Sequence, residues 1–397
     1  MSKLPKNWKE VNLVDCLESL IDYRGKTPKK SDSGILTLSA KSVKMGYIDY
    51  NQAYYISQET YDKFMVRGFP KKGDVLMTTE APLGCIAKLD RDDVSVAQRL
   101  LTLRGKENIL DNNYLLYYLT SKRGQYELNS RASGSTVQGI KRSEFEYVKI
   151  VLPNTYEEQK AIAKILSSFD NKIELLKEQN KTLETMVQTV FKEWFVDDED
   201  TKSYLFKELI DSISVKHNFN NEKVIFLNTS DIYDGKVLHN QYSNIEGLPG
   251  QAKKSIQKND ILFTEIRPAN KRFAYIDFEA NDYVVSTKLM VLRSKNIIDT
   301  SILYSFLKLP YTLKYLQILA ESRSGTFPQI TFEHVQGIEI FVPKNKLLLN
   351  NVTNLFKNII NKTLQNNKSI QILQKTRDTL LPKLMSGNLR VKGFEND

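Results

Sequence analysis

The apolar positions of this chain follow two patterns that alternate along its length. Runs such as GDVLMTT (73–79), GCIAKL (84–89) and VVSTKLMVLR (284–293), in segments punctuated by glycine and proline, are typical of β-strands. After Pro153, and again after Pro343, apolar residues recur in alternating steps of three and four, which predicts long helices. The pattern therefore predicts two globular parts, each followed by a long helix.

Each globular part also contains a helical segment. NNYLLYYLTSKRGQYELNS (112–130) predicts one helix with Asp111 or Asn112 as its N-cap, and its counterpart SILYSFLKLPYTLKYLQILA (301–320) is interrupted by Pro310. Because strands and helices are mixed in both parts, we expect an α/β (α+β) fold with two similar domains.

The second half of the chain repeats the first. TLSAKSVKMG (37–46) matches FLNTSDIYDG (226–235), and KKGDVLMTTEAPLG (71–84) matches QKNDILFTEIRPAN (257–270). VAQRLLTLR matches VSTKLMVLR, RASGSTVQ matches SRSGTFPQ, and VKIVLP matches IEIFVP. Five matches in the same order, at offsets of 186 to 191 residues, indicate an internal duplication. At 397 residues, the chain is long enough for globular domains at 1–152 and 199–342 and helical tails at 153–198 and 343–397.

The two tails are predicted to form a coiled-coil seam. The first stripe consists of Ile162, Leu166, Phe169, Ile173, Leu176, Asn180, Leu183, Val187, Val190 and Trp194. The second consists of Leu349, Val352, Phe356, Ile359, Thr363, Asn366, Ile370, Leu373, Arg377, Leu380 and Leu384, with Pro382 and Gly387 predicted to end the helix. Neither stripe is stable when exposed alone, so we expect the tails to pack on each other.

Charge favours pairing of the two tails over pairing of like tails. Residues 151–200 hold 6 basic and 11 acidic residues, whereas 343–397 hold 10 basic and 3 acidic ones. Antiparallel packing would place the globular domains at opposite ends, related by a pseudo-two-fold axis. Asn180 and Asn366 either pair to fix the register or occupy tolerated, solvated positions.

Composition narrows the possible partners and compartment. The net charge is +10 and the pI is about 9.2, which favours a polyanionic partner. No apolar run is long enough for a membrane span and no apolar stretch follows the charged N-terminus, so we expect a cytoplasmic protein. Cys16 and Cys85, too few for a disulfide framework, fit a reducing compartment and structural burial.

The motifs of common catalytic sites are missing from the sequence. RGKT (24–27) resembles the end of a phosphate-binding loop, but the required glycine is replaced by Leu20. No two prolines are adjacent, which excludes the Pro-Pro-aromatic signature of amino-methyltransferases. His217, His239 and His334 lack metal-ligand or triad spacing. We therefore predict no catalytic residue and no metal site.

Basic and amide residues in loops are the candidate DNA contacts. Lysine and arginine neutralise phosphates, and arginine, glutamine and asparagine can read base edges with paired hydrogen bonds. A Ser-Gly-[Ser/Thr]-x-x-Gln segment recurs in both copies, which favours a functional contact over a solvated surface. The predicted contacts are Arg24, Lys26, Lys29, Lys30, Arg131, Ser133, Ser135, Gln138, Lys141, Arg142, Arg267, Lys271, Arg272, Arg323, Ser324, Thr326 and Gln329.

Over essentially its whole length the sequence resembles the specificity subunits of type I restriction-modification systems. LPNTYEEQKAIAKILSSFDNKIELLKEQNKTLETMVQTVFKEWFVD (152–197) is similar to the central conserved region of that family, and RDTLLPKLMSGNLRV (377–391) is similar to its distal one. The resemblance implies two target-recognition domains, each reading one half of a bipartite DNA site. It also implies that the helices measure the unread spacer.

The resemblance also implies partners and cofactors. Methyltransferase subunits, two of them in the simplest case, would dock on the helices and carry S-adenosylmethionine, and restriction subunits would supply ATP- and magnesium-dependent translocation and cleavage. No cofactor is expected on this chain. One departure is that Glu157, Glu158 and Gln159 correspond to Leu347, Leu348 and Leu349, so the two helices differ in the residues that they offer to a docking partner.

Two other readings of the sequence remain. A coiled-coil adaptor with a basic surface for acidic proteins would share the charge and the heptads, but would lack the steep salt dependence of phosphate contacts. A fragment of a fused restriction-methylation enzyme would show methyl transfer by the isolated chain. The absence of catalytic motifs from the sequence argues against this interpretation.

Overall fold

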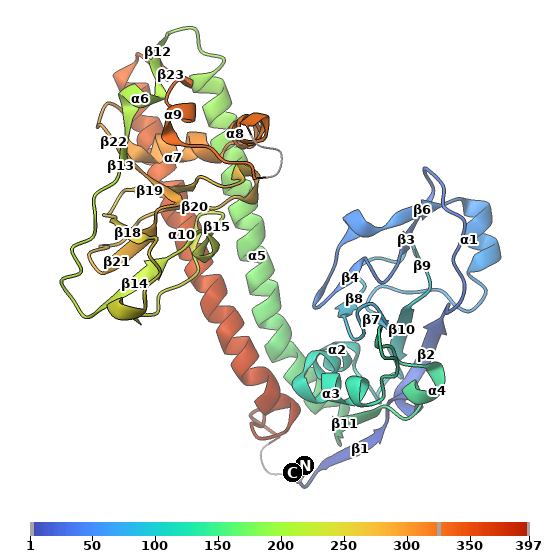
Figure 1. Cartoon of the computed structure of the whole chain (residues 1–397). Helices are drawn as coiled ribbons and strands as arrows, with labels where there is room; N and C mark the ends of the chain where they lie inside the picture. Colours follow the sequence, from blue (N-terminus) through green and yellow to red (C-terminus); the bar gives the residue numbers. More distant parts are fainter. Residues whose placement is uncertain (1–3, 324–326, 395–397) are drawn as a thin grey trace. The chain divides into compact units, whose positions relative to one another are not determined.

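The computed structural model describes residues 4–323 and 327–394. The chain divides into two compact units, unit 1 (Met1–Glu174 and Ile372–Asp397) and unit 2 (Leu175–Gln371). None of the helices in the described part of the chain combines the length and the apolar character that a membrane span requires. The two units are described in turn, with the labels of Figure 1.

Unit 1 is built on a four-stranded antiparallel sheet in the order β2-β10-β7-β8. A second sheet has the order β6-β3-β9 with β3 parallel to β9, and β1 pairs antiparallel with β11. The strands are β1 (Trp8–Asn12), β2 (Leu17–Asp22), β3 (Ile35–Leu38), β4 (Val43–Lys44), β5 (Tyr47–Ile48), β6 (Tyr54–Ile56), β7 (Val75–Thr78), β8 (Ile86–Lys88), β9 (Val94–Val96), β10 (Leu100–Gly105) and β11 (Lys149–Pro153). The helices are α1 (Gln58–Phe64), α2 (Asn112–Thr120), α3 (Lys122–Ser130) and α4 (Arg142–Phe145).

The main sheet of unit 1 is buried on both faces. Val75 and Met77 of β7 belong to the core that contains the residues of α2 and α3, whereas Leu76 belongs to the core shared with the second sheet. Side chains alternate between the faces of a strand, so a strand covered on both sides becomes apolar throughout. This explains the continuous apolar run of GDVLMTT and confirms the predicted strand.

Unit 2 repeats this plan. Its main sheet has the order β13-β22-β19-β20, its second sheet β17-β14-β21-β18 has β14 parallel to β21, and β12 pairs antiparallel with β23. The strands are β12 (Thr201–Leu205), β13 (Ile210–Ile213), β14 (Lys223–Leu227), β15 (Ile232–Tyr233), β16 (Lys236–Val237), β17 (Ser243–Asn244), β18 (Ala252–Ser255), β19 (Ile261–Thr264), β20 (Phe273–Tyr275), β21 (Tyr283–Ser286), β22 (Leu289–Ser294) and β23 (Glu339–Pro343). The helices are α6 (Phe206–Leu209), α7 (Thr300–Lys308), α8 (Pro310–Arg323) and α9 (Phe332–Val335). The predicted mixed fold with two similar domains is confirmed.

Two predicted segments are each divided in the structure. The single helix expected over 112–130 is wrong, because α2 ends at Thr120 and Ser121 caps α3 by accepting from the amide of Gly124 at 3.2 Å. A Cβ on Gly124 would lie 2.1 Å from a backbone oxygen of α2, so this residue keeps the two helices close. Ser121 and Gly124 thus make the break that Pro310 makes in unit 2. The strand expected over 284–293 is likewise two strands, β21 and β22.

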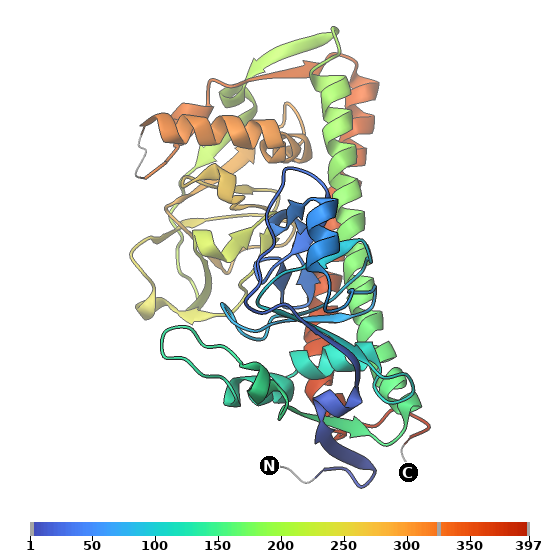
Figure 2. The ribbon, with the colours of Figure 1, turned by 90° about the vertical axis from the view of Figure 1, so that its right-hand side faces the viewer.

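The two long helices are α5 (Tyr156–Phe195) and α10 (Lys346–Met385). In each unit a stretch of one lies beside a stretch of the other, as the green and red helices show in Figures 1 and 2. The contacts run antiparallel: Asp170 meets Arg377 in unit 1, and Asn180 meets Asn367 in unit 2. The predicted antiparallel packing is confirmed within each unit.

Every predicted stripe residue of these helices is buried or half-buried. The predicted stripe did not include Phe191 and Phe195. These two residues are more buried than the predicted Val190 and Trp194, because they enter the core of unit 2. Pro382 lies inside the last turn of α10, so the prediction that it ends the helix is wrong. The proline removes one helical hydrogen bond, but the helix runs on for three residues to Met385, and Gly387 follows with a φ of 70°.

Candidate nucleic-acid interface

An exposed loop of unit 1 carries several of the predicted DNA contacts. Ser133 and Gly139 exchange both backbone hydrogen bonds, at 2.9 and 3.0 Å, and so close the loop. Gly134 has a φ of 114°, and a Cβ there would lie 2.2 Å from a backbone oxygen of the same loop. Only glycine fits this position. Ser135 and Gln138 are exposed on the closed loop.

A hollow of about 470 Å³ lies at the base of this loop. Three of the predicted residues line it, namely Arg24, Ser133 and Lys141. The guanidinium of Arg24 donates to the carbonyl of Ile140 at 2.8 Å and lies 3.1 Å from Asp22. Arg24 therefore helps to hold the wall of the hollow, which restricts its freedom to contact DNA.

The other predicted residues of unit 1 lie around the hollow rather than in it. Arg142 lines a neighbouring hollow of about 330 Å³ together with Arg24. Arg131 is 3.4 Å from the carboxylate of Glu127 in an ion pair one helical turn apart. Lys26, Lys29 and Lys30 are exposed on the segment after β2. These residues remain predicted contacts.

Among the other residues that line the hollow, three have charged or amide side chains that the sequence did not single out: Glu80, Gln98 and Arg99. Gln98 and Arg99 form the turn between β9 and β10, and Nε of Arg99 lies 2.7 Å from Oε1 of Glu80. The signal was present in the repeat, since VAQRLL and VSTKLM align on this turn. It carried no information that Glu80, nineteen positions away, lies beside Arg99.

The turn and the loop of unit 1 share one backbone frame. The amide of Thr79 donates to the carbonyl of Arg99 at 2.9 Å, and the carbonyl of Thr79 accepts from the amide of Ile140 at 3.0 Å. The segment after β7 is thereby held between the β9–β10 turn and the exposed loop. Side chains on all three segments are displayed from a fixed backbone.

Unit 2 has the same frame with other side chains. The amide of Glu265 donates to the carbonyl of Lys288 at 3.0 Å, and its carbonyl accepts from the amide of Ile330 at 2.8 Å. Gln329, a predicted contact, is half-buried and forms a β-bridge with Ile266. Where unit 1 has Thr79 and Arg99, unit 2 therefore has Glu265 and Lys288.

The remaining predicted contacts of unit 2 differ in availability. Arg267 is exposed, with a φ of 45°, and Lys271 is half-buried with a φ of 54°. Arg272 donates to the carbonyls of Ser230 and Ile232 at 3.1 and 3.0 Å, so its guanidinium holds the turn before β15. Outside the described residues lie Ser324 and Thr326, together with the side chain of Arg323.

Charges beside the frame of unit 2 are partly buried. Burial raises the pKa of Glu265 above its ordinary value, an effect that the nearby Lys254 and Lys288 oppose. Burial also lowers the pKa of Lys254, whose ammonium donates to the carbonyls of Thr287 and Leu289 at 3.1 and 2.8 Å. Unit 2 therefore places a desolvated charge cluster where unit 1 places a solvent-accessible ion pair.

A buried ion pair braces the main sheet in each unit. Asp74 holds Arg104 in unit 1 and Asp260 holds Arg293 in unit 2, each through two hydrogen bonds of 2.7 to 2.9 Å. Hydrogen bonding to the carboxylate raises the pKa of both arginines. These arginines, although aligned in the repeat, are structural.

Polar contacts within unit 1 hold the parts of α5 and α10 that belong to this unit. Arg390 donates to Glu158 at 2.7 and 3.1 Å, and the carboxylate is 3% exposed. Gln159 donates to the carbonyl of Ile109 at 2.9 Å. Asp170 binds Arg377 and accepts from the hydroxyl of Tyr117 at 2.6 Å. The C-terminal segment is thereby fastened to the start of α5.

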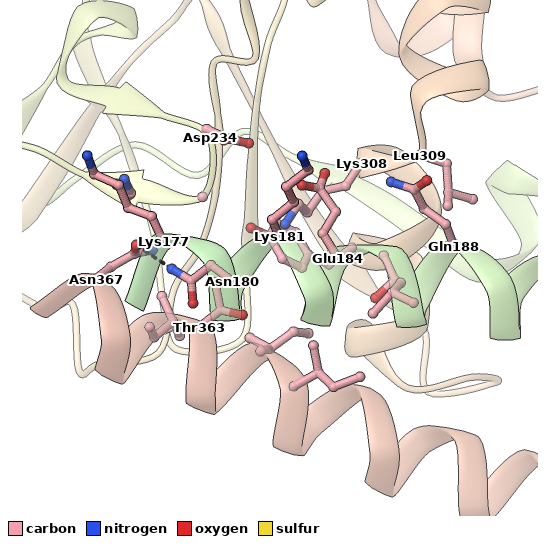
Figure 3. A pocket seen from close by; sticks show the side chains of 18 of the residues that line it. Lys177, Asn180, Lys181, Glu184, Gln188, Asp234, Lys308, Leu309, Thr363 and Asn367 are labelled. Carbon is pink, nitrogen blue, oxygen red and sulfur yellow. Dashed lines mark hydrogen bonds between the residues drawn. The ribbon is translucent and has the colours of Figure 1, made fainter. Parts of the chain in front are cut away.

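Asparagines connect the helices in unit 2. Nδ2 of Asn366 donates to Oδ1 of Asn180 at 2.8 Å and to Oε1 of Gln179 at 2.9 Å, and Nδ2 of Asn180 donates to Asn367 at 3.1 Å. Figure 3 shows Asn180 and Asn367 facing each other across the helices. Asn366 is 2% exposed. The predicted pairing of Asn180 with Asn366 is confirmed, and the reading as solvated positions is wrong.

A cavity of about 250 Å³ lies beside these asparagines in unit 2. Its walls come from α5, α10, the end of α7 and the turn at Asp234, and the side chains of Lys181, Glu184 and Lys308 extend into it in Figure 3. The ammonium of Lys308 lies 5.4 Å from the centre of the Tyr304 ring. Burial lowers the pKa of Lys308.

The described residues contain no group of three or more metal-ligating side chains. His217 is buried and accepts from the amide of Phe219 at 2.9 Å, and His334 accepts from the amide of Thr331 at 2.8 Å. Both histidines therefore have local structural partners.

Comparison with known proteins identifies the family. The protein-family model described as "Type I restriction modification DNA specificity domain" matches the sequence twice, at residues 5–185 and 207–374. The HindI type I restriction enzyme specificity subunit of Haemophilus influenzae is 44% identical over 146 residues, which is 36% of this chain and only 32% of that protein. The MjaIX specificity subunit of Methanocaldococcus jannaschii is 27% identical over 368 residues, or 85% of this chain and 82% of that protein.

A solved structure shows the same fold over nearly the whole chain. The type I restriction-modification S subunit from M. genitalium superposes with a TM-score of 0.67 at 18% sequence identity, covering 96% of this chain and 98% of that one. The two matched regions fall on the two repeats, whose main sheets share one strand order. The chain therefore belongs to the type I restriction modification DNA specificity family, and is a specificity protein rather than a catalytic subunit.

Proposed function

We propose that the chain reads DNA for a type I restriction-modification complex, with one recognition domain in each unit and each domain reading one half of a bipartite target. One observation carries the proposal. Thr79 and Glu265 occupy the same backbone frame, yet the side chains displayed from that frame differ between the units. A constant frame with variable side chains suits two half-sites of different sequence.

We further propose that α5 and α10 fix the unread spacer and dock two methyltransferase subunits for adenine methylation. Each helix has 40 residues, roughly 60 Å at 1.5 Å per residue. S-adenosylmethionine, ATP and magnesium would be bound by the methyltransferase and restriction subunits. In this proposal the present chain recognises DNA, and its partner subunits carry out the chemistry.

Single-molecule sequencing of DNA from cells that co-express this chain and its modification subunit tests the proposal. We expect adenine methylation at one motif made of two short defined halves with an undefined spacer of constant length. The control is the same cell with the modification subunit alone, which should leave the motif unmethylated. Methylation that is absent, or confined to a continuous motif, would contradict the proposal.

A salt series separates DNA reading from the adaptor alternative. We expect the affinity of the chain for duplex DNA to fall steeply and linearly on a logarithmic salt scale, because each neutralised phosphate releases counterions. The measurement is filter binding between 50 and 200 mM salt. An acidic protein partner, bound with weak salt dependence in place of DNA, would favour the adaptor.

A further inference from the structure

The β9–β10 turn of unit 1 is rigid at its backbone and accessible at its side chains. The amide of Ala97 donates to the carbonyl of Leu38 at 2.8 Å, and the carbonyl of Arg99 accepts from Thr79 at 2.9 Å. Strand β9 is an edge of one sheet and β10 lies inside the other. The turn is therefore anchored on both sides, while the side chain of Arg99 is half exposed.

Arg99 adopts an unusual backbone conformation, with a φ of 69°. This left-handed region costs a residue with a Cβ about 1 kcal/mol, and glycine or asparagine would adopt it more easily. Strain of this kind is kept where the direction of a side chain matters. Here it places the guanidinium over the hollow that also contains Ser133 and Lys141.

The only charged partner found for Arg99 among the described residues is Glu80, whose side chain is 40% exposed. An ion pair this exposed to solvent is weak and easily exchanged. Arg24, which also lines the hollow, donates to a backbone carbonyl, and Arg104 is held by Asp74. Arg99 therefore has a guanidinium available for exchange from Glu80 to a ligand.

Unit 2 has the matching turn with a different cation. Lys288 occupies the frame position of Arg99, because its carbonyl accepts from the amide of Glu265 as the carbonyl of Arg99 accepts from the amide of Thr79. A guanidinium can donate two parallel hydrogen bonds to O6 and N7 of guanine, whereas an ammonium is a compact charge without this fork. The two turns therefore suit different base contacts.

From this geometry, and resting on the proposed function, we infer that Arg99 is a specificity-determining residue of the first recognition domain. It leaves Glu80 on binding and contacts the edge of a guanine in one half-site. Neither residue was among the contacts that the sequence predicted. Arg99 is thus paired with Glu80 in the free protein and with the guanine in the DNA complex.

Motif sequencing of Arg99 variants in the co-expressed complex tests this inference. With Arg99→Ala we expect one half-site to lose its requirement for guanine at one position, with methylation of sites carrying another base rising roughly ten- to a hundredfold relative to the wild type. Arg99→Lys, which keeps the charge, should relax the same position less. The other half-site should be unchanged for both variants.

Arg123→Ala is the matched control, because Arg123 makes a similar surface ion pair with Glu10 at 2.9 Å but does not line the hollow. It should leave the motif unchanged. If both Arg99 variants keep the wild-type motif, or lose methylation equally at all sites, Arg99 reads no base and the inference is overturned. If the wild type itself methylates no bipartite motif, the proposed function fails instead, and the inference falls with it.

Discussion

The two units share a backbone plan but hold the helix pair by opposite chemistry. In unit 1, Asp170 of α5 binds Arg377 of α10, and Glu158 binds Arg390. At the equivalent places unit 2 has Ile360 and Leu348, both packed against its apolar core. A duplicated frame therefore does not fix which side chains meet across it.

This difference makes each helix end specific for its own unit. The end of α10 brings Arg377 to Asp170, and the segment after α10 brings Arg390 to Glu158 near the start of α5. The end of α5 brings Phe191, whose ring stacks with that of Phe356, at 6.5 Å between centres. Exchanging the ends would bury charge against apolar side chains, which is costly. Complementarity of this kind selects one pairing of two similar helices.

The largest effect is expected from Glu158→Gln, which removes the charge that faces Arg390. The lost pair should destabilise the protein by about 2–4 kcal/mol, because a partly buried guanidinium is left without its carboxylate. Urea unfolding of the full chain measures the change. Lys344→Met is the control, since its pair with Asp200 is exposed and should contribute less than about 1 kcal/mol.

The double variant Glu158→Leu with Arg390→Met sharpens the comparison, because it places apolar side chains in unit 1 where unit 2 already has them. We expect it to recover most of the loss, since a well-packed apolar pair can replace a buried ion pair. A double variant as unstable as Glu158→Gln would mean that unit 1 requires charge at this position.

A smaller effect is expected from Asn366→Ala in unit 2. The side chain is 2% exposed and donates to both Asn180 and Gln179, so truncation should cost about 1–3 kcal/mol. Thermal unfolding of the single variants and of Asn180→Ala/Asn366→Ala measures the coupling. Additive losses would show that the two asparagines act independently, against the contact described above.

The smallest effect is expected from Lys308→Met. This variant should raise the free energy of unfolding by about 1 kcal/mol at neutral pH, because it buries no charge. Thr120 ends the equivalent helix of unit 1, so this desolvated ammonium is special to unit 2. Burial lowers the pKa of Lys308, so the unfolded chain binds the proton more tightly and wild-type stability rises with pH.

The gain from Lys308→Met should therefore shrink as the pH approaches the ordinary lysine value near 10.5. Unfolding midpoints between pH 6 and the alkaline limit of the protein follow this trend, with Lys314→Met as a control on the exposed face of α8. A gain that does not vary with pH would assign the effect to packing and not to charge.

Much of the architecture was readable from the sequence because its signals are local and periodic. The apolar run in GDVLMTT predicted β7, the heptads predicted both long helices, and the repeat predicted two similar domains. A polar residue at a stripe position, such as Asn366, predicted its partner because antiparallel helices leave few others in reach. The matched repeats also indicated where the loops of each copy lie.

Only the tertiary structure decided which of the candidate side chains are available. Arg24 and Arg272 donate to backbone carbonyls of distant turns, whereas Arg99 is brought beside Glu80 by the meeting of a turn and a strand end. These contacts depend on how loops from different sheets converge, which no local period encodes. The duplication was therefore determined by the sequence, and the chemistry of each copy by the fold.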